Sequence, residues 1–182
     1  MLNEKIICAG FGGQGVMLMG QLISYAGMLE GKEVSWLPSY GPEMRGGTAN
    51  CSVMVSAKPI GSPVITDDAT TAIVMNLPSL DKFEVDVATG GNIIINSSLI
   101  ERKTKRDDLK AYYVPANDIA VELGNARVAN MIMLGAYLEL TKVVSVESVM
   151  TALKKIFGES KAHLMKINED ALAKGAESIK AQ

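Results

Sequence analysis

Cysteine and histidine are scarce in this chain: its 182 residues include two cysteines, Cys8 and Cys51, and one histidine, His163. A tetrahedral zinc site or a cysteine-ligated iron–sulfur cluster takes about four ligands, so no such site is expected on this chain. Both cysteines lie in strand-like apolar runs and are predicted to be buried free thiols. The histidine lies far from any serine or cysteine motif and is predicted to be on the surface. A nucleophilic triad is therefore not expected.

An excess of one charge and a long apolar run are also lacking. The formal net charge is −2, which gives no basic face of the kind that nucleic-acid binders carry. No apolar run approaches the roughly 18 residues of a membrane span, and no basic region followed by an apolar stretch opens the sequence. We expect a cytoplasmic protein that binds neither nucleic acid nor a membrane. Its 48% hydrophobic content is enough for one core, so residues 1–182 are predicted to form a single domain.

Apolar residues recur with the periods of strands and helices along most of the chain. Strands are predicted at residues 5–9, 33–37, 48–56, 72–75, 92–95 and 111–114. Helices are predicted at residues 13–30, 78–83, 117–123, 127–140, 146–157 and 161–180. Pro38 is expected to end the strand at residues 33–37. Ser145 is expected to cap the helix at residues 146–157. The pattern predicts an α/β fold, a three-layer Rossmann-like mixed sheet with a helical carboxyl-terminal segment.

Two segments carry more specific expectations. Thr48–Ser56 alternates between apolar and polar residues with the single exception of Met54, which predicts a half-exposed strand antiparallel to its neighbour. Its polar face is compatible with an obligate partner surface. The run Glu101–Asp108 mixes charges of both signs and is predicted to be a solvated surface segment rather than a recognition patch.

The most informative motif is the glycine loop, residues 10–15, which reads Gly-Phe-Gly-Gly-Gln-Gly between a predicted strand and a predicted helix. Such a turn brings main-chain N–H groups to a ligand at a helix N-terminus, where the dipole favours anions. The spacing matches the dinucleotide-binding fingerprint. However, the second strand ends Trp36-Leu37-Pro38 without the carboxylate that would hold a ribose, which argues against NAD.

Other readings of the glycine loop remain open. A Walker-type phosphate loop is excluded because no Gly-Lys-Ser/Thr follows the glycines. The loop is then either a main-chain site for an anion or a partner's backbone, or a set of glycines that serve only close helix–strand packing.

A second motif, Ser39–Thr48, reads Ser-Tyr-Gly-Pro-Glu-Met-Arg-Gly-Gly-Thr and follows the second strand. Because ligands of open α/β sheets bind outside the carboxyl ends of the strands, both motifs are expected at one rim. The two glycines after Arg45 leave room for a phosphate or a neighbouring chain against its guanidinium group. The alternative is an ordinary surface pair of Arg45 with Glu43. Asn76 and Asn96–Ser98 follow two further strands and are expected at the same rim.

Together the two motifs resemble the gamma subunit of 2-oxoacid:ferredoxin oxidoreductases, and the resemblance covers nearly the whole chain, including Asn76–Pro78 and Asn130–Leu138. It implies a component of a multi-subunit enzyme that decarboxylates a 2-oxoacid on thiamine diphosphate and transfers the acyl group to coenzyme A. Electrons leave through iron–sulfur clusters to ferredoxin. The resemblance also implies that this chain alone binds no cofactor. Thiamine diphosphate, Mg²⁺ and the clusters would belong to alpha, beta and delta-type subunits.

The resemblance associates this domain with the access of coenzyme A to the active site, so the two motifs are predicted to contact coenzyme A or a partner subunit. The predicted contact residues are Gly12, Gly13, Gln14, Gly15, Tyr40, Glu43, Arg45, Gly46 and Gly47. No catalytic residue and no metal ligand are expected. The second motif, continued through Asn50, looks most like members acting on 2-oxoglutarate. Two other hypotheses are a free-standing nucleotide-binding or regulatory module and a purely structural subunit.

Overall fold

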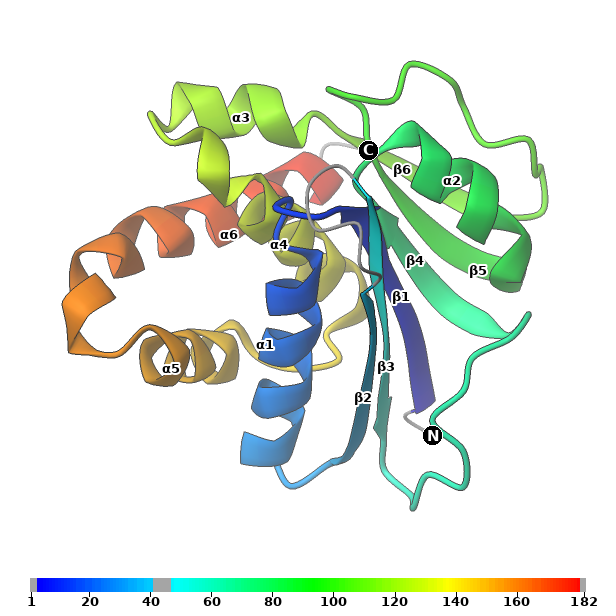
Figure 1. Cartoon of the computed structure of the whole chain (residues 1–182), viewed down its shortest axis with the longest axis horizontal. Helices are drawn as coiled ribbons and strands as arrows, with labels where there is room; N and C mark the ends of the chain where they lie inside the picture. Colours follow the sequence, from blue (N-terminus) through cyan, green and yellow to red (C-terminus); the bar gives the residue numbers. More distant parts are fainter. Residues whose placement is uncertain (1–2, 41–46, 181–182) are drawn as a thin grey trace.

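Six strands form one mixed sheet in a computed structural model that describes residues 3–40 and 47–180 (Figure 1). The strands are β1 (Asn3–Phe11), β2 (Glu33–Tyr40), β3 (Thr48–Ser56), β4 (Ala69–Val74), β5 (Val87–Asn96) and β6 (Lys110–Val114). The helices are α1 (Val16–Leu29), α2 (Leu77–Phe83), α3 (Ala116–Glu122), α4 (Ala129–Thr141), α5 (Val146–Phe157) and α6 (Met165–Lys180). Short 3-10 turns join them: η1 (Glu84–Asp86), η2 (Ala126–Val128) and η3 (Glu159–Leu164).

The strand order is β2-β3-β1-β4-β5-β6, with β3 antiparallel to both of its neighbours and β1, β4, β5 and β6 mutually parallel. The antiparallel prediction for residues 48–56 is therefore confirmed. The carboxyl ends of the parallel strands meet at one edge of the sheet, and the loops that follow β1, β4 and β5 lie there.

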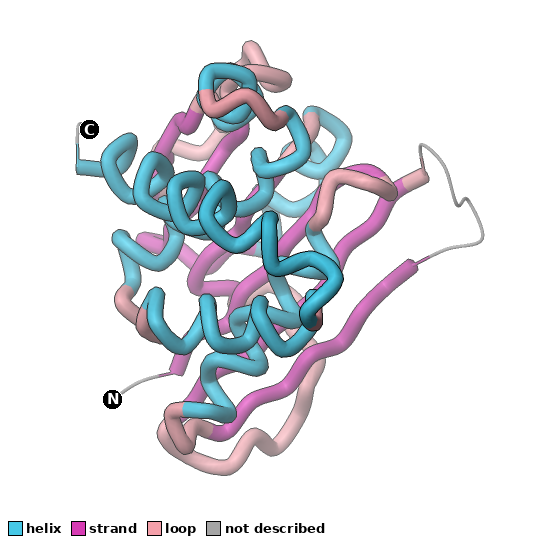
Figure 2. The backbone as a smooth tube through the Cα atoms, turned by 90° about the vertical axis from the view of Figure 1, so that its left-hand side faces the viewer, coloured by secondary structure: helices cyan, strands magenta, loops and turns pink. Residues whose placement is uncertain are grey.

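Helices cover both faces of the sheet, so the predicted three-layer α/β arrangement with a helical carboxyl-terminal segment is confirmed. Alternate residues of β1 point to opposite sides, because side chains of a strand alternate. Ile6 and Cys8 pack under α1 and α4–α6, whereas Ile7 and Ala9 pack under α2. Figure 2 shows the molecule from the side of the larger helical layer, so the helices of this layer lie in front of the strands. Within the described residues, no helix is long and apolar enough to cross a bilayer.

The predictions that both cysteines are buried free thiols and that the histidine lies on the surface are confirmed. Cys8 and Cys51 face each other across β1 and β3, and both are free and buried. The neighbouring Cys51 thiol and burial raise the pKa of the Cys8 thiol well above its usual value. A thiol in this environment is a poor nucleophile. His163 is exposed in η3.

Pro38 does not end the second strand, which continues to Tyr40. The prediction was wrong because β2 is an edge strand, paired only with β3, where Pro38 lies opposite Cys51. A proline is tolerated at an edge when its missing N–H would have faced away from the neighbouring strand. Strand β2 therefore pairs with β3 from Ala49 to Ser56, and the second motif begins inside the sheet.

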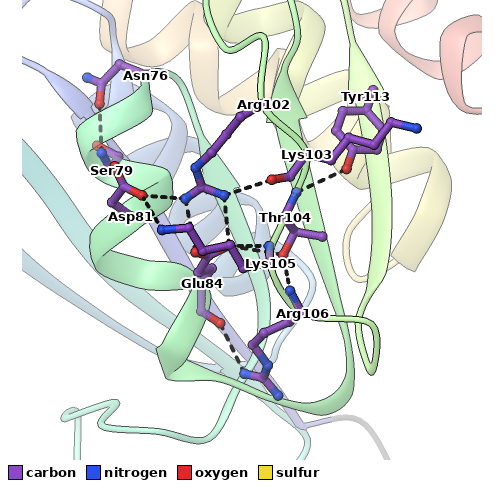
Figure 3. Close-up of polar contacts among 10 residues, drawn as sticks. All are labelled: Asn76, Ser79, Asp81, Glu84, Arg102, Lys103, Thr104, Lys105, Arg106 and Tyr113. Atoms are coloured by element: carbon purple, nitrogen blue, oxygen red, sulfur yellow. Dashed lines mark hydrogen bonds and ion pairs between the residues drawn. The ribbon is translucent and has the colours of Figure 1, made fainter.

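The run Glu101–Asp108 is not simply solvated, because two of its arginines are half-buried and bound to the η1 turn (Figure 3). The Glu84 carboxylate, only 4% exposed, accepts from the Arg102 guanidinium at 3.0 Å, from the Thr104 hydroxyl at 3.0 Å and from the Lys105 main chain at 3.1 Å. We call these contacts the Glu84 clamp. Sequence alone could not show it, since charge patterning does not reveal a buried partner twenty residues away.

Arg106 and Arg102 extend the Glu84 clamp to neighbouring main chain and side chains. The Arg106 guanidinium donates to the carbonyls of Glu84 at 3.0 Å and Val87 at 2.5 Å, and it pairs with Asp108. Arg102 also pairs with Asp81 of α2 at 2.5 Å. The segment therefore fastens the far end of α2 to the sheet.

Glu30 links the end of α1 to the start of α5. Its carboxylate accepts from the Lys32 ammonium at 2.6 Å and from the Ser145 main chain at 2.7 Å. Ser145 in turn caps α5, as predicted, by accepting from the Ser148 main chain. Burial by itself raises the pKa of Glu30, but these hydrogen bonds outweigh it and hold the pKa at about 2.

This depressed pKa makes the Glu30 contribution to stability pH-dependent. A group with a lower pKa in the folded state stabilises fully above its unfolded pKa and loses that effect as the pH falls through its folded pKa. We expect Glu30→Gln to lower the free energy of unfolding by about 1 kcal/mol at pH 7, with the difference shrinking towards zero as the pH approaches 2. Urea unfolding of both proteins across this pH range measures it. A difference that stays constant with pH would contradict the assignment.

Candidate functional site

The glycine loop joins the end of β1 to the start of α1, as predicted. Gly13 has φ +95° and Gly15 has φ +77°, a left-handed conformation that side-chain-bearing residues rarely adopt. The Gln14 N–H donates to the Phe11 carbonyl at 3.1 Å and closes the turn. Gly15 precedes α1 without any side-chain cap on that helix.

The two sequence motifs are in direct contact. The Gly12 N–H donates to the Gly47 carbonyl at 3.0 Å, and Phe11 lies opposite Thr48 in the β1–β3 ladder. The main chain of Tyr40 lies opposite Ala49 at the end of β2. Of the predicted contact residues, Gly12, Gly13, Gln14, Gly15 and Gly47 are thus brought together, with the backbone of Tyr40 one strand away. Glu43, Arg45 and Gly46 lie outside the described residues.

Gln14 folds back over the turn instead of pointing away from it. Its Oε1 accepts from the Phe11 N–H at 2.7 Å and from Asn76 Nδ2 at 3.1 Å. Gly10 leaves the space this requires, since a Cβ there would lie 2.7 Å from the same oxygen and 2.9 Å from Met75 Cβ. Gly10 therefore serves close packing. Gly13 is open among the described residues: apart from its chain neighbours, none of their atoms lies within 4 Å of its Cβ position.

Asparagines gather behind the glycine loop at the carboxyl ends of β4 and β5. Asn76 caps α2 by accepting from the Ser79 N–H at 2.9 Å, as Figure 3 shows. Asn96 Nδ2 donates to Asn117 Oδ1 at 2.8 Å. Asn130, on α4, donates through Nδ2 to the Gly15 carbonyl at 3.4 Å. The expectation that Asn76 and Asn96 follow their strands to this edge is confirmed.

Sequence reasoning missed Asn117 and Asn130 as members of this cluster. Asn130 opens a stretch in which every residue through Leu138 is buried, and it is itself only 5% exposed. An amide inside a helix that is otherwise buried on all sides is the signal that could have identified it, because buried polar groups find hydrogen-bond partners.

A hollow of about 430 Å³ lies beside the glycine loop, between the first turns of α1 and the start of β3. Its walls are mostly apolar, with Phe11, Val16, Met17 and Leu18 beside the open loop glycines. None of its described lining residues carries an ionisable side chain. This part of the rim is therefore suited to binding through main-chain groups and apolar contact, and it offers no acid, base or nucleophile.

The described part of the chain provides no group of side chains that could hold a metal ion. Within residues 3–40 and 47–180, no three histidine, cysteine, aspartate or glutamate side chains come together as ligands. The two cysteines are buried in the core under the larger helical layer. These residues do not fit an iron–sulfur cluster or the metal of a thiamine diphosphate site.

Comparison with known proteins finds the same unit in several oxidoreductases. Residues 5–178 match the family described as pyruvate ferredoxin/flavodoxin oxidoreductase. The chain is 39% identical, over 95% of its length, to the ketoisovalerate oxidoreductase subunit VorA of Methanothermobacter marburgensis, but spans only 36% of that protein. It is 36% identical to the 2-oxoglutarate synthase subunit KorC of Methanocaldococcus jannaschii, covering 84% of this chain and 82% of that subunit.

The fold has a close counterpart among solved structures. The gamma subunit of a keto/oxoacid ferredoxin oxidoreductase from Geobacter sulfurreducens PCA superposes with a TM-score of 0.83 at 27% identity. The match covers 98% of this chain and 99% of that subunit.

Proposed function

Because the chain belongs to the pyruvate ferredoxin/flavodoxin oxidoreductase family, we propose that it is the gamma-type subunit of a 2-oxoacid:ferredoxin oxidoreductase. The assembled enzyme would oxidatively decarboxylate a 2-oxoacid, form an acyl-coenzyme A and pass electrons to ferredoxin. The observation that carries the proposal is the Gly12–Gly47 hydrogen bond, which joins the two motifs of the resemblance into one rim. The relatives named as KorC and as a gamma subunit support it, since each matches this chain over most of its length.

Cofactor chemistry is assigned to partner subunits in this proposal. Thiamine diphosphate, Mg²⁺ and iron–sulfur clusters would be held by alpha, beta and delta-type subunits, because the described residues of this chain do not provide their ligands. Ferredoxin would receive electrons from the complex. This chain would contribute to the binding of coenzyme A or a partner subunit and to the access of coenzyme A to the active site. It would work in the cytoplasm.

The rim is the part of the chain that we propose to face coenzyme A or a partner subunit. The Gly12–Gly15 turn presents main-chain groups, and the hollow next to it presents apolar surface. Tyr40, Glu43, Arg45 and Gly46 belong to the second motif that Gly47 closes. In this proposal the Arg45 guanidinium pairs with a coenzyme A phosphate or a partner carboxylate.

The substrate that we propose is 2-oxoglutarate, on the residues of the second motif from Ser39 to Asn50. Relatives named for 2-oxoglutarate and for ketoisovalerate are both similar to this chain, so the assay must compare substrates. Turnover of the assembled enzyme with 2-oxoglutarate, ketoisovalerate and pyruvate decides between them, and a preference for either of the latter two would overturn this assignment.

Arg45→Ala in the assembled enzyme is expected to raise the KM for coenzyme A about tenfold while assembly and kcat stay unchanged, since a charge-assisted contact contributes about 1.4 kcal/mol. Steady-state kinetics with varied coenzyme A measure it. Lys58→Ala, which removes an exposed charge beyond the opposite end of β3, is the matched control and is expected to leave KM unchanged. The isolated chain is expected to turn over no 2-oxoacid.

Three outcomes would redirect the assignment. Unchanged KM, turnover and assembly in Arg45→Ala would contradict a role for the second motif. Impaired assembly with an unchanged KM would favour a purely structural subunit. Thermal stabilisation of the isolated chain by NAD, FAD or AMP would favour the free-standing nucleotide-binding module.

A further inference from the structure

Three amide side chains hold the glycine loop from three different elements. Gln14 belongs to the loop itself, Asn76 follows β4 and Asn130 lies in the first turn of α4. Each contacts the loop through a hydrogen bond: Gln14 Oε1 with the Phe11 N–H, Asn76 Nδ2 with Gln14 Oε1, and Asn130 Nδ2 with the Gly15 carbonyl. At Gly13, by contrast, no atom of the described residues, apart from those adjoining it, lies within 4 Å of the Cβ position.

We propose that Asn76 and Asn130 are positioning residues that fix the conformation of the glycine loop, Asn76 through Gln14 and Asn130 through Gly15. The inference rests on the proposed function, because the loop is the segment that we assign to coenzyme A or a partner subunit. Neither asparagine needs to touch the ligand. Their role is to set the directions of the loop main-chain groups before a ligand arrives, which lowers the ordering cost of binding.

The hydrogen bonds leave one orientation for each amide of the Gln14–Asn76 pair. Asn76 Oδ1 accepts from the Ser79 N–H at 2.9 Å, so its Nδ2 must face Gln14. Gln14 Oε1 receives both that Nδ2 and the Phe11 N–H, which uses its two lone pairs. Reversing either amide would place two donors or two acceptors against each other. The pair is therefore a directional link from the loop to the start of α2.

The other end of that link is rigid. The helix α2 begins at the Asn76 cap and ends at η1, where the Glu84 clamp and the Arg102–Asp81 ion pair fasten it (Figure 3). Asn76 thus connects the loop to a helix that is held in place at both ends. A short, half-exposed turn depends on contacts of this kind for a defined shape, because its glycines have the largest backbone freedom of any residue.

Asn130 holds the other side of the loop. It is 5% exposed, and its Nδ2 would lie 2.4 Å from a Cβ at position 15. Gly15 is required there twice, by its φ of +77° and by the asparagine against it. Two helices, α2 and α4, therefore define the loop from opposite ends.

Asn76→Asp tests the proposal without removing the helix cap. The new carboxylate still accepts from the Ser79 N–H, but it cannot donate to Gln14 Oε1. The Gln14 amide must then turn its NH₂ group towards the carboxylate, which breaks the bond to the Phe11 N–H. We expect the Phe11 amide proton to exchange with solvent about tenfold faster in the full chain. In the assembled enzyme, the KM for coenzyme A is expected to rise about fivefold with kcat unchanged.

Gln14→Met is the second variant, and it removes the shared acceptor from a half-exposed position where folding is not at stake. It is expected to reproduce both effects, and the double variant is expected to add little to either single one, because the two residues act through one link. Asp81→Asn is the matched control: it removes an exposed partner of Arg102 but keeps the Glu84 clamp that fastens α2, and it leaves Asn76 and Gln14 intact, so Phe11 exchange and KM should not change.

The outcomes separate this inference from the proposed function. Faster Phe11 exchange with a raised KM supports both. Faster exchange with an unchanged KM and normal assembly upholds the positioning role and overturns the assignment of the loop to coenzyme A. Unchanged exchange in both Asn76→Asp and Gln14→Met overturns the positioning role, and additive effects in the double variant would overturn the single link through Gln14.

Discussion

Gly175→Ala is expected to lower the free energy of unfolding by about 3 kcal/mol, one of the two largest effects we predict. A Cβ at position 175 of α6 would lie 1.9 Å from the Ile132 carbonyl oxygen and 2.8 Å from the Ala136 nitrogen, both main-chain atoms of α4. The contact is reciprocal, because a Cβ at Gly135 of α4 would lie 2.1 Å from the Leu172 carbonyl of α6. Main-chain atoms inside a buried helix cannot move aside, so the two helices would have to separate.

The expected loss of stability has the opposite sign to the usual effect of replacing a helical glycine with alanine. At an exposed helical position, replacing glycine with alanine stabilises by about 1 kcal/mol through helix propensity. Ala173→Gly, at an exposed position of the same helix, is the matched control and is expected to cost about 1 kcal/mol. Urea unfolding of the wild type and both variants gives the comparison. A Gly175→Ala protein as stable as the wild type would show that α4 and α6 are farther apart than described.

Glu84→Ala is expected to lower the free energy of unfolding by about 2–3 kcal/mol. The variant would leave the Arg102 guanidinium, the Thr104 hydroxyl and the Lys105 N–H without their shared acceptor. Arg102 is half-buried and keeps its exposed partner Asp81 and the Lys103 carbonyl, so the loss is smaller than for a fully buried ion pair. The segment 101–108 would then be held to η1 only through Arg106, whose guanidinium donates to the Glu84 and Val87 carbonyls.

The pH dependence provides a second readout for the Glu84 clamp. Burial by itself raises the pKa of Glu84, but hydrogen bonds from Arg102, Lys105 and Thr104 outweigh it and leave the pKa below its ordinary value. Its stabilising effect is therefore complete above the unfolded pKa and is lost as the pH falls through the folded pKa. The difference in the free energy of unfolding between Glu84→Ala and the wild type should therefore become smaller as the pH falls.

Asp81→Ala is the control for Glu84→Ala, because it removes the exposed partner of Arg102 and keeps the buried one. We expect it to cost less than about 0.5 kcal/mol. Equal losses for the two variants would show that the exposed pair, rather than the buried carboxylate, holds the segment in place.

Sequence periodicity predicted the secondary structure well where burial is regular. The predicted segments 72–75 and 92–95, apolar apart from Asn92, lie in or at the central strands β4 and β5. The alternation at Thr48–Ser56 marks a strand with antiparallel neighbours. These patterns succeed because a buried face imposes its period on the residues that form it. The contact of Gly12 with Gly47 was also foreseeable, since both motifs follow strand ends.

What the sequence could not predict depends on contacts between distant segments. The edge position of β2, which makes Pro38 tolerable, follows from strand order rather than from local preference. The Glu84 clamp pairs residues whose charges look like ordinary surface charges. Asn130 reaches Gly15 across 115 positions of the chain, and no local rule links an amide on a helix to a glycine turn. The roles of Glu43, Arg45 and Gly46 remain predictions.

The proline in the edge strand also limits what can attach to this sheet. Pro38 lies opposite Cys51 in the β2–β3 ladder. Prolines of edge strands generally turn the side that lacks the N–H outwards, so a seventh strand laid along β2 would find no donor there. A polypeptide laid along β2 would find its hydrogen-bonding row interrupted near the second motif. Copies of the protein are thereby hindered from stacking edge to edge into fibrils, a hazard of any open sheet. We expect association at this edge to depend more on side-chain contacts than on main-chain hydrogen bonds.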